Sequence, residues 1–152
     1  MKKSKVVKSR LLAIHQSKVM VLQKVGKKRK YTLPGGIKKN SETEIQALIR
    51  ETKEEIELDI VDLNCTFFLS LVKSSTEEFI NRNYYYIHME PMAINVKEKE
   101  KFKKVLWLNW KKALEHMDRS DQLAVKTYFK NVADNFQNHV KYGHKISSRI
   151  AM

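Results

Sequence analysis

The sequence predicts an α+β fold of the α/β/α sandwich kind, in which a mixed β-sheet lies between helices. Three observations favour it: strand-like apolar runs flank one helical segment, an amphipathic helix follows them, and no linker rich in Pro, Gly or Ser divides the chain. The 152 residues, 42% hydrophobic and 31% charged, predict one domain over residues 1–152, with a loosely held basic tail at 142–152.

The strands are predicted from short runs containing β-branched and aromatic residues between turn signals. KSRLLAIHQS and KVMVLQKV predict a strand pair, and KYTLPGGIKK predicts a strand end, a turn and a short strand. DLNCTFFLSLV and NRNYYYIHMEP flank the polar loop KSSTEE and predict a hairpin. KKVLWLNW predicts a further strand, and WKKALEHM a short helix.

Two longer helices are predicted from apolar spacing. The first covers residues 42–56, where Ser41 followed by Glu44 fits a capping box. The second covers the run SDQLAVKTYFKNVADNFQNHV and is amphipathic. Its predicted apolar positions include Leu123, Tyr128, Val132 and Phe136.

The charge of the chain is large and unevenly distributed. The net charge is +13, which favours anionic partners such as nucleotides or nucleic acid, although solubility alone is an alternative. Residues 42–62 hold eight acids and two bases, a net of −6, so the remainder carries +13 + 6 = +19. An acidic segment in a basic chain predicts a cation site that meets an anionic ligand.

Several function classes have no support in the sequence. No run approaches about 18 apolar residues, so no transmembrane helix is expected. The single cysteine, Cys65, cannot form an internal disulfide and is predicted to be a small core residue, which fits a reducing cytoplasm. The five histidines show no metal-ligand spacing.

The acidic segment places carboxylates together on one helical face. With Glu51 set at 0° and about 100° per residue, Glu55 falls near 40° and Glu54 near 300°. Like charges at these spacings destabilise a helix, and under the alternative of a merely solvated face only limited basic residues could compensate the repulsion. A hard divalent cation such as Mg²⁺ or Mn²⁺ would offset it, because these ions prefer carboxylate oxygens.

The stretch Gly36–Leu58, GIKKNSETEIQALIRETKEEIEL, resembles the Nudix box. That pattern is G, five residues, E, seven residues, R-E-U, one residue, E-E, one residue, G-U, where U is bulky and apolar. The matching residues are Gly36, Glu42, Arg50, Glu51, Glu54, Glu55 and Leu58. Thr52 and Glu57 depart from it. Glu57 stands where the family has glycine, at a helix end able to adopt a positive φ. A residue other than glycine there either costs about 1 kcal/mol or makes the loop take another path.

The resemblance implies a Nudix fold and a metal-dependent hydrolase that breaks a phosphoanhydride bond in a nucleoside diphosphate linked to another moiety. It implies Mg²⁺ or Mn²⁺ held by Glu51, Glu54 and Glu55, with the Gly36 carbonyl as a further ligand. Glu54 or Glu55 is also the candidate base, Arg50 orients a carboxylate such as Glu51, and Glu42 is structural. Glu100, with Glu98 beside it, is a candidate acid from a later loop, or part of a solvated charge run. A homodimer is expected on family grounds alone.

The substrate is left open by the sequence. Lys38, Lys39 and Arg29 are predicted to meet substrate phosphates, and Tyr84 and Tyr86 either to stack on a base or to pack in the core. A nucleoside triphosphate, a dinucleoside polyphosphate, an inositol pyrophosphate or an RNA 5′ end all fit the basic excess. The alternative function is a non-catalytic module that binds nucleic acid or another polyanion.

Overall fold

Seven strands and the helices packed on them make up the fold, which a computed structural model describes for residues 3–61 and 64–132. The strands are β1 (Ser4–His15), β2 (Lys18–Lys24), β3 (Tyr31–Thr32), β4 (Gly35–Ile37), β5 (Thr66–Ser74), β6 (Glu78–His88) and β7 (Phe102–Asn109). The helices are α1 (Glu44–Ile56) and α2 (Trp110–Leu114), and residues 119–132 are also helical. Among the described residues, no helix is both long and apolar enough to cross a membrane.

The sheet is mixed, as predicted. Its main order is β3-β2-β1-β6-β5, with β4 beside β1 and β7 beside β2. β1 runs parallel to β6, and the other pairs are antiparallel. The predicted hairpin of β5 and β6, the strand β7 and the short helix α2 are all confirmed.

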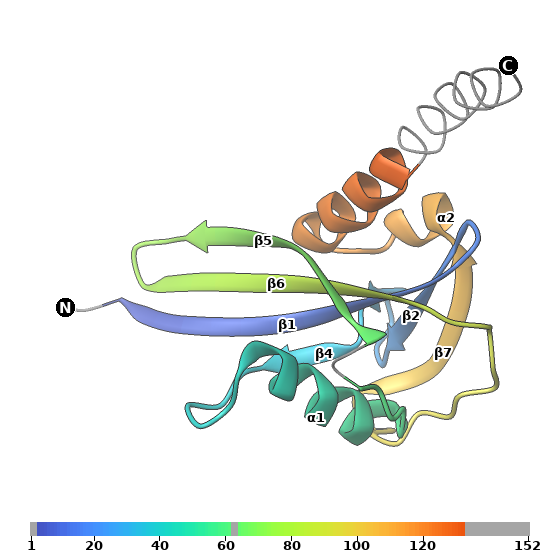
Figure 1. Cartoon of the computed structure of the whole chain (residues 1–152), viewed down its shortest axis with the longest axis horizontal. Coiled ribbons are helices and arrows are strands. Elements are labelled where there is room, and N and C mark those ends of the chain that lie inside the picture. The colour runs from blue at the N-terminus through green and yellow to red at the C-terminus, as the bar shows by residue number, and fades with distance from the viewer. Residues whose placement is uncertain (1–2, 62–63, 133–152) are drawn as a thin grey trace, which may run out of the picture.

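Helices cover both faces of the sheet (Figure 1). Because side chains alternate along a strand, β1 sends Leu11 and Ala13 toward α1, and Leu12 and Ile14 toward the opposite face. On the α1 side, Leu48 and Ile56 complete one core, with Cys65 partly buried against it. On the other side α2 and the helical residues 119–132 close a second core. Sheet and helices thereby form the predicted three layers.

The start of α1 differs from the prediction. Its N-cap is Thr43, whose hydroxyl accepts from the Gln46 N–H at 3.2 Å, while the Gln46 side chain accepts from the Thr43 N–H at 2.9 Å. The predicted Ser41–Glu44 capping box is therefore wrong. Glu42 instead closes a turn with Lys39, whose N–H donates to the Glu42 carboxylate at 2.8 Å, so the helix begins after that turn.

The predicted apolar stripe of the last helix is also partly wrong. Tyr128 is buried, but Leu123 is 51% exposed and Val132 is 45% exposed. The buried face is formed by Ala124, Val125, Tyr128 and Phe129, whose spacing of three and four residues makes a neighbouring stripe. Phe136 and the tail 142–152 lie outside the described residues.

The helix α1 ends at Glu57, the position where the Nudix box has glycine. Glu57 is the C-cap and adopts a left-handed conformation with φ 52° and ψ 27°. Its N–H donates to the Lys53 carbonyl at 3.0 Å, which closes the final turn. A side chain is strained in this region, whereas glycine is not. The helix therefore keeps the family's turn with a residue poorly suited to it.

We expect Glu57→Gly to stabilise the protein by about 0.5–1 kcal/mol, because it removes the left-handed strain at some cost in unfolded-state entropy. The exposed pair of Glu57 with Lys97, 3.5 Å apart, contributes little. The free energy of unfolding in urea measures the effect. Glu57→Ala is the control, since it removes the carboxylate and keeps the strain. Equal stability of the Gly and Ala variants would contradict the prediction.

Candidate active site

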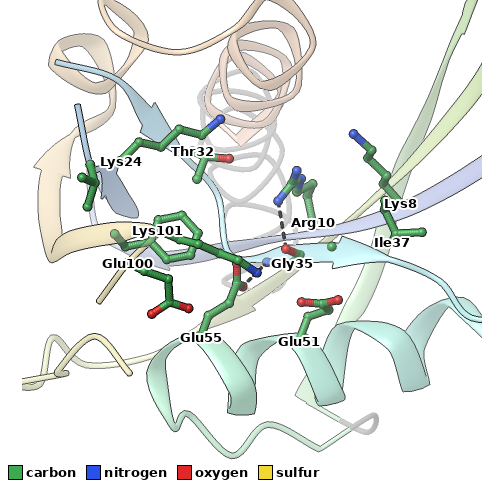
Figure 2. Close-up of a pocket in the computed structure, with 13 residues that line it drawn as sticks. Lys8, Arg10, Lys24, Thr32, Gly35, Ile37, Glu51, Glu55, Glu100 and Lys101 are labelled. Carbon is green, nitrogen blue, oxygen red and sulfur yellow. Dashed lines mark hydrogen bonds between the residues drawn. The ribbon is translucent and has the colours of Figure 1, made fainter. Parts of the chain in front are cut away.

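The acidic side of α1 lies against β4, and both elements line a pocket of about 550 Å³ (Figure 2). Glu51 and Glu55 are one helical turn apart and both reach this pocket. Four cationic side chains also line it: Lys8 and Arg10 from β1, Lys24 from β2, and Lys101 before β7. The remaining lining residues are Val25, Thr32, Gly35, Gly36, Ile37, Glu100 and Phe102. Carboxylates and cations thus share one hollow.

Gly36 lets the Glu51 carboxylate lie against β4. A Cβ at Gly36 would lie 2.4 Å from the Glu51 carboxyl carbon, closer than real side chains approach. Gly35 has a different constraint, since its φ is 135° and a Cβ there would lie 1.9 Å from the Ser9 carbonyl oxygen. The two glycines therefore allow the strand to pass close to both α1 and β1.

Glu55 is the most perturbed of these carboxyl groups. It is 4% exposed, and its Oε1 accepts a hydrogen bond of 2.8 Å from the Gly35 N–H. Burial raises the pKa of Glu55 to about 8, with the negative charges of Glu51 and Glu98 adding to the rise. The Gly35 hydrogen bond and the Arg10 charge oppose it. A carboxyl group with a pKa near neutrality can both accept and release a proton under ordinary conditions.

Arg50 links the remaining acids of the site. Its guanidinium donates to Glu42 at 2.6 and 3.0 Å, to Glu51 at 3.0 Å and to Glu54 at 3.2 Å. It also donates to the Ile37 carbonyl at 3.0 Å. The hydrogen bond from Arg50 lowers the pKa of Glu42 to about 2. Arg50 therefore makes the contact with Glu51 that the resemblance implied, and it also binds Glu42.

The donor set suits a hard divalent cation. Glu51 and Glu55 present carboxylate oxygens to the pocket, the ligand type that Mg²⁺ and Mn²⁺ prefer. The Glu54 side chain is 51% exposed, pairs with Arg50 and does not line the pocket. Within residues 3–61 and 64–132, no three His, Cys, Asp or Glu side chains are gathered closely enough to hold a metal. Water and substrate oxygens would therefore complete the coordination of an ion bound here.

The two candidate acids of the later loop differ in their relation to the pocket. Glu100 lines the pocket, as Figure 2 shows. Glu98 does not, but its charge acts on Glu55, and its Oε1 is buried without a hydrogen-bond partner among the described residues. Its Oε2 lies 2.9 Å from Lys101 Nζ. Both acids are thus close to the site, with Glu100 nearer to the ligand space.

The predicted substrate-binding residues are not among those that line this pocket. Lys38, Lys39 and Arg29 do not line it. Tyr84 is fully buried and donates to Asp121 at 2.8 Å, while Tyr86 packs against the ring of Tyr128. The alternative of core packing therefore describes the two tyrosines, and burial corrects the base-stacking interpretation of Tyr84.

The pocket cations Lys8, Arg10 and Lys101 were missed by sequence reasoning. Lys8 and Arg10 alternate along β1, a signal that they share one face of the strand. Nothing local shows that Lys101 comes to the same pocket. Arg10 donates to the carbonyls of Leu33 and Gly35 at 3.2 and 2.9 Å, so it also supports the loop that carries the glycines.

Comparisons with known proteins identify a family from the sequence and a shared fold from solved structures. The family model of the NUDIX domain matches residues 7–129. No curated protein matches the sequence at a significant level. Among solved structures, the E. coli ORF135 protein is similar at 16% identity with a TM-score of 0.69, covering 87% of this chain and 94% of its own.

Two further structures share the fold. A C. elegans Ap4A hydrolase is 18% identical with a TM-score of 0.67, covering 85% of this chain and 98% of its own. An E. coli dihydroneopterin triphosphate pyrophosphohydrolase is 18% identical with a TM-score of 0.65, covering 84% and 95%. At these identities the likeness establishes the fold.

Proposed function

Because the chain belongs to the NUDIX family, we propose that it is a metal-dependent hydrolase that cleaves a phosphoanhydride bond in a nucleoside diphosphate linked to another moiety. One observation carries the proposal: Glu51 and Glu55 line the same pocket as four cationic side chains. Cations of this kind bind phosphate oxygens, and the carboxylates would suit a divalent ion that neutralises phosphate charge. The substrate class is a nucleotide derivative.

The pocket residues have separate proposed roles in binding the metal, orienting its ligands and binding the diphosphate. Glu51 and Glu55 would hold Mg²⁺ or Mn²⁺, with Glu54 and the Gly36 carbonyl as further proposed ligands. When bound, such an ion neutralises phosphate oxygens and acidifies the attacking water. Arg50 fixes the orientation of Glu51, and the Gly35 N–H fixes that of Glu55. Lys8, Arg10, Lys24 and Lys101 orient the diphosphate.

Glu55 is the proposed base. Its carboxyl faces the pocket and its pKa is raised to about 8, whereas Glu54 is turned toward Arg50 and solvent. In the reaction the water oxygen bonds to phosphorus and the bridging P–O bond breaks. The phosphate leaves with the bonding electron pair, and the water proton passes to Glu55. Glu100 is a weaker candidate for the same proton because it also lines the pocket.

A substrate panel tests the proposal. The protein is incubated with Mg²⁺ or Mn²⁺ and with nucleoside triphosphates, dinucleoside polyphosphates, nucleotide sugars and inositol pyrophosphates, and the products are separated. We expect hydrolysis of at least one nucleotide substrate, abolished by EDTA and restored by added metal. Absence of hydrolysis across the panel, or full activity in EDTA, would overturn the proposal.

We also expect Mg²⁺ to raise the melting temperature more at pH 8.5 than at pH 5.5. The pKa of Glu55 without metal is about 8, above the ordinary 4.5, so metal competes with a proton at the lower pH. Differential scanning fluorimetry measures both increments. In Glu55→Gln the increment at pH 8.5 should fall toward that at pH 5.5. Equal increments in the parent at both pH values would contradict the expectation.

A further inference from the structure

Two basic segments lie side by side at the edge of the pocket. Residues 24–30 carry five cations and no acid, and residues 97–104 carry five lysines and two glutamates. The first segment has a net charge of +5 and the second a net charge of +3, so together they carry +8 of the chain's +13. The Val25 N–H donates to the Lys101 carbonyl at 2.9 Å, and Lys24 pairs with Phe102 in the sheet. We call these two segments the basic strip.

Most of the strip's charge has no acidic partner. All ten cations are exposed. Lys97 pairs with Glu57 at 3.5 Å and Lys101 with Glu98 at 2.9 Å. The other eight form no ion pair with any residue in the described ranges: Lys24, Lys27, Lys28, Arg29, Lys30, Lys99, Lys103 and Lys104. Like charges held together in this way raise the local positive potential and attract an extended anion.

The strip continues the pocket into a second hollow. This hollow, of about 480 Å³, is lined by Val25, Asn95, Val96, Lys99, Phe102 and Lys103. Val25 and Phe102 line both hollows, so the two adjoin along these residues. Lys24 and Lys101 stand on the pocket side, and Lys99 and Lys103 on the far side. A ligand that fills the pocket can therefore extend past Val25 and remain among lysines.

The chemistry of the second hollow favours a strand with bases over a bare phosphate chain. Val25 lines both hollows, and its apolar side chain is 49% exposed although most residues of the two segments are cationic. An inorganic polyphosphate has nothing to place on an exposed apolar side chain, whereas a nucleotide base does. Asn95 adds an amide that can both donate and accept hydrogen bonds. A cationic groove with apolar surface for bases is the usual form of a single-strand site.

Resting on the proposed function, we propose that the substrate is a single-stranded oligonucleotide with a 5′ di- or triphosphate. An oligonucleotide has phosphoanhydride bonds only at its 5′ end, so that end occupies the pocket beside Glu51 and Glu55. The following nucleotides lie along the basic strip. Water adds its oxygen to a 5′ phosphorus, the bridging P–O bond breaks, and phosphate or pyrophosphate leaves. The water proton passes to Glu55, and the strand keeps a 5′-monophosphate.

Substrate length tests the proposal. We expect kcat/KM for 5′-triphosphorylated oligoribonucleotides to rise at least about tenfold from the mononucleotide to about five nucleotides, and then to level off, since each strand phosphate bound adds a salt-dependent contact. The Lys99→Glu/Lys103→Glu variant should reduce the ratio of the ten-nucleotide to the mononucleotide value at least about fivefold. The control Lys126→Glu/Lys130→Glu changes the same charge at exposed positions on the last helix and should leave that ratio unchanged. A ratio near one in the parent would overturn the proposal.

A binding measurement separates this proposal from the hydrolase itself. Fluorescence anisotropy with a 3′-labelled, 5′-monophosphorylated decamer requires no hydrolysis. We expect it to bind at least about tenfold more tightly than a mononucleotide, and the Lys99→Glu/Lys103→Glu variant to lose most of this difference. Inorganic polyphosphate of equal phosphate number should compete poorly. Equal competition by polyphosphate would overturn the assignment of the ligand to a nucleic-acid strand. Hydrolysis of mononucleotides without any dependence on length would overturn the role of the basic strip, while the proposed hydrolase function would still stand.

Discussion

Glu55→Gln is expected to lower kcat/KM at least about 10²-fold, the usual size of a lost general base. The amide cannot take a proton from water and is a poor ligand for a hard cation. Glutamine keeps an oxygen that can accept the Gly35 N–H, so the loop and α1 should remain in place. Steady-state hydrolysis of a nucleotide substrate with saturating Mg²⁺ measures the loss.

The same substitution is expected to stabilise the metal-free protein at alkaline pH. The folded-state pKa of Glu55 is about 8 and its ordinary value is 4.5, so folding favours the protonated carboxyl. That preference contributes stability below pH 4.5, and the contribution is lost as pH rises through about 8. The full difference corresponds to at most about 5 kcal/mol. Glutamine is never ionised, so its unfolding free energy in urea should depend less on pH.

Two controls isolate Glu55 from its neighbours. Glu57→Gln removes the same charge at a position that does not line the pocket, and should keep near-parental activity. Glu54→Gln should cost less activity than Glu55→Gln, because Glu54 is half-exposed and paired with Arg50. Retained activity in Glu55→Gln, or a larger loss of activity in Glu54→Gln, would show that Glu55 is not the general base.

Gly35→Ala is expected to destabilise the protein by more than about 3 kcal/mol, in the range reserved for backbone strain and overpacking. Its Cβ would lie 1.9 Å from the Ser9 carbonyl oxygen, and backbone atoms of the paired strand β1 cannot move aside easily. The φ of 135° adds strain for any side chain. Circular dichroism and urea unfolding measure the result.

The other glycines provide matched comparisons. Gly26→Ala has a similar φ of 145° with nothing within 4 Å of its Cβ, so it measures the conformational strain alone. The three atoms nearest to a Cβ in Gly36→Ala all belong to the Glu51 carboxyl group, which can rotate away. It should stay folded and lose activity, since Glu51 leaves its position. Equal stability of the Gly35 and Gly26 variants would show that the contact with Ser9 is not limiting.

The helical part of the site could be predicted because its geometry is local. Helical spacing placed Glu51 and Glu55 on one side of α1, and the Nudix-box resemblance implied the Arg50–Glu51 contact. It left open whether Glu57 adopts the left-handed C-cap or the loop takes another path, and the structure has the left-handed C-cap. The capping-box pattern did not identify the N-cap of α1, because two overlapping stretches of sequence fit it. Ser41–Glu44 and Thr43–Gln46 both fit a capping box, and the hydrogen bonds of Glu42 with Lys39 decided between them.

The cationic part of the site depends on strand pairing, which local spacing does not show. Lys8 reaches the pocket because β1 pairs with β4, and Lys101 because β2 pairs with β7. The stripe of the last helix was misplaced for a related reason: Leu123 and Val132 are apolar, but the sheet receives the adjacent face with Ala124 and Val125. The basic residues nearest the box in sequence, Lys38 and Lys39, do not line the pocket.

The parallel pairing of β1 with β6 has a consequence for how the protein is made. Ser4 pairs with Glu78 and Ile14 with His88, so each partner is 74 residues away in the chain. Contacts of such sequence separation require costly loop closure and slow folding. During synthesis, a nascent chain that has already released the whole of α1 can pair β1 with β2 and β4, but it still lacks β6, the long parallel partner of β1. The pocket also lacks Glu100, Lys101 and Phe102 at that stage, so a fully assembled pocket is a late product of folding.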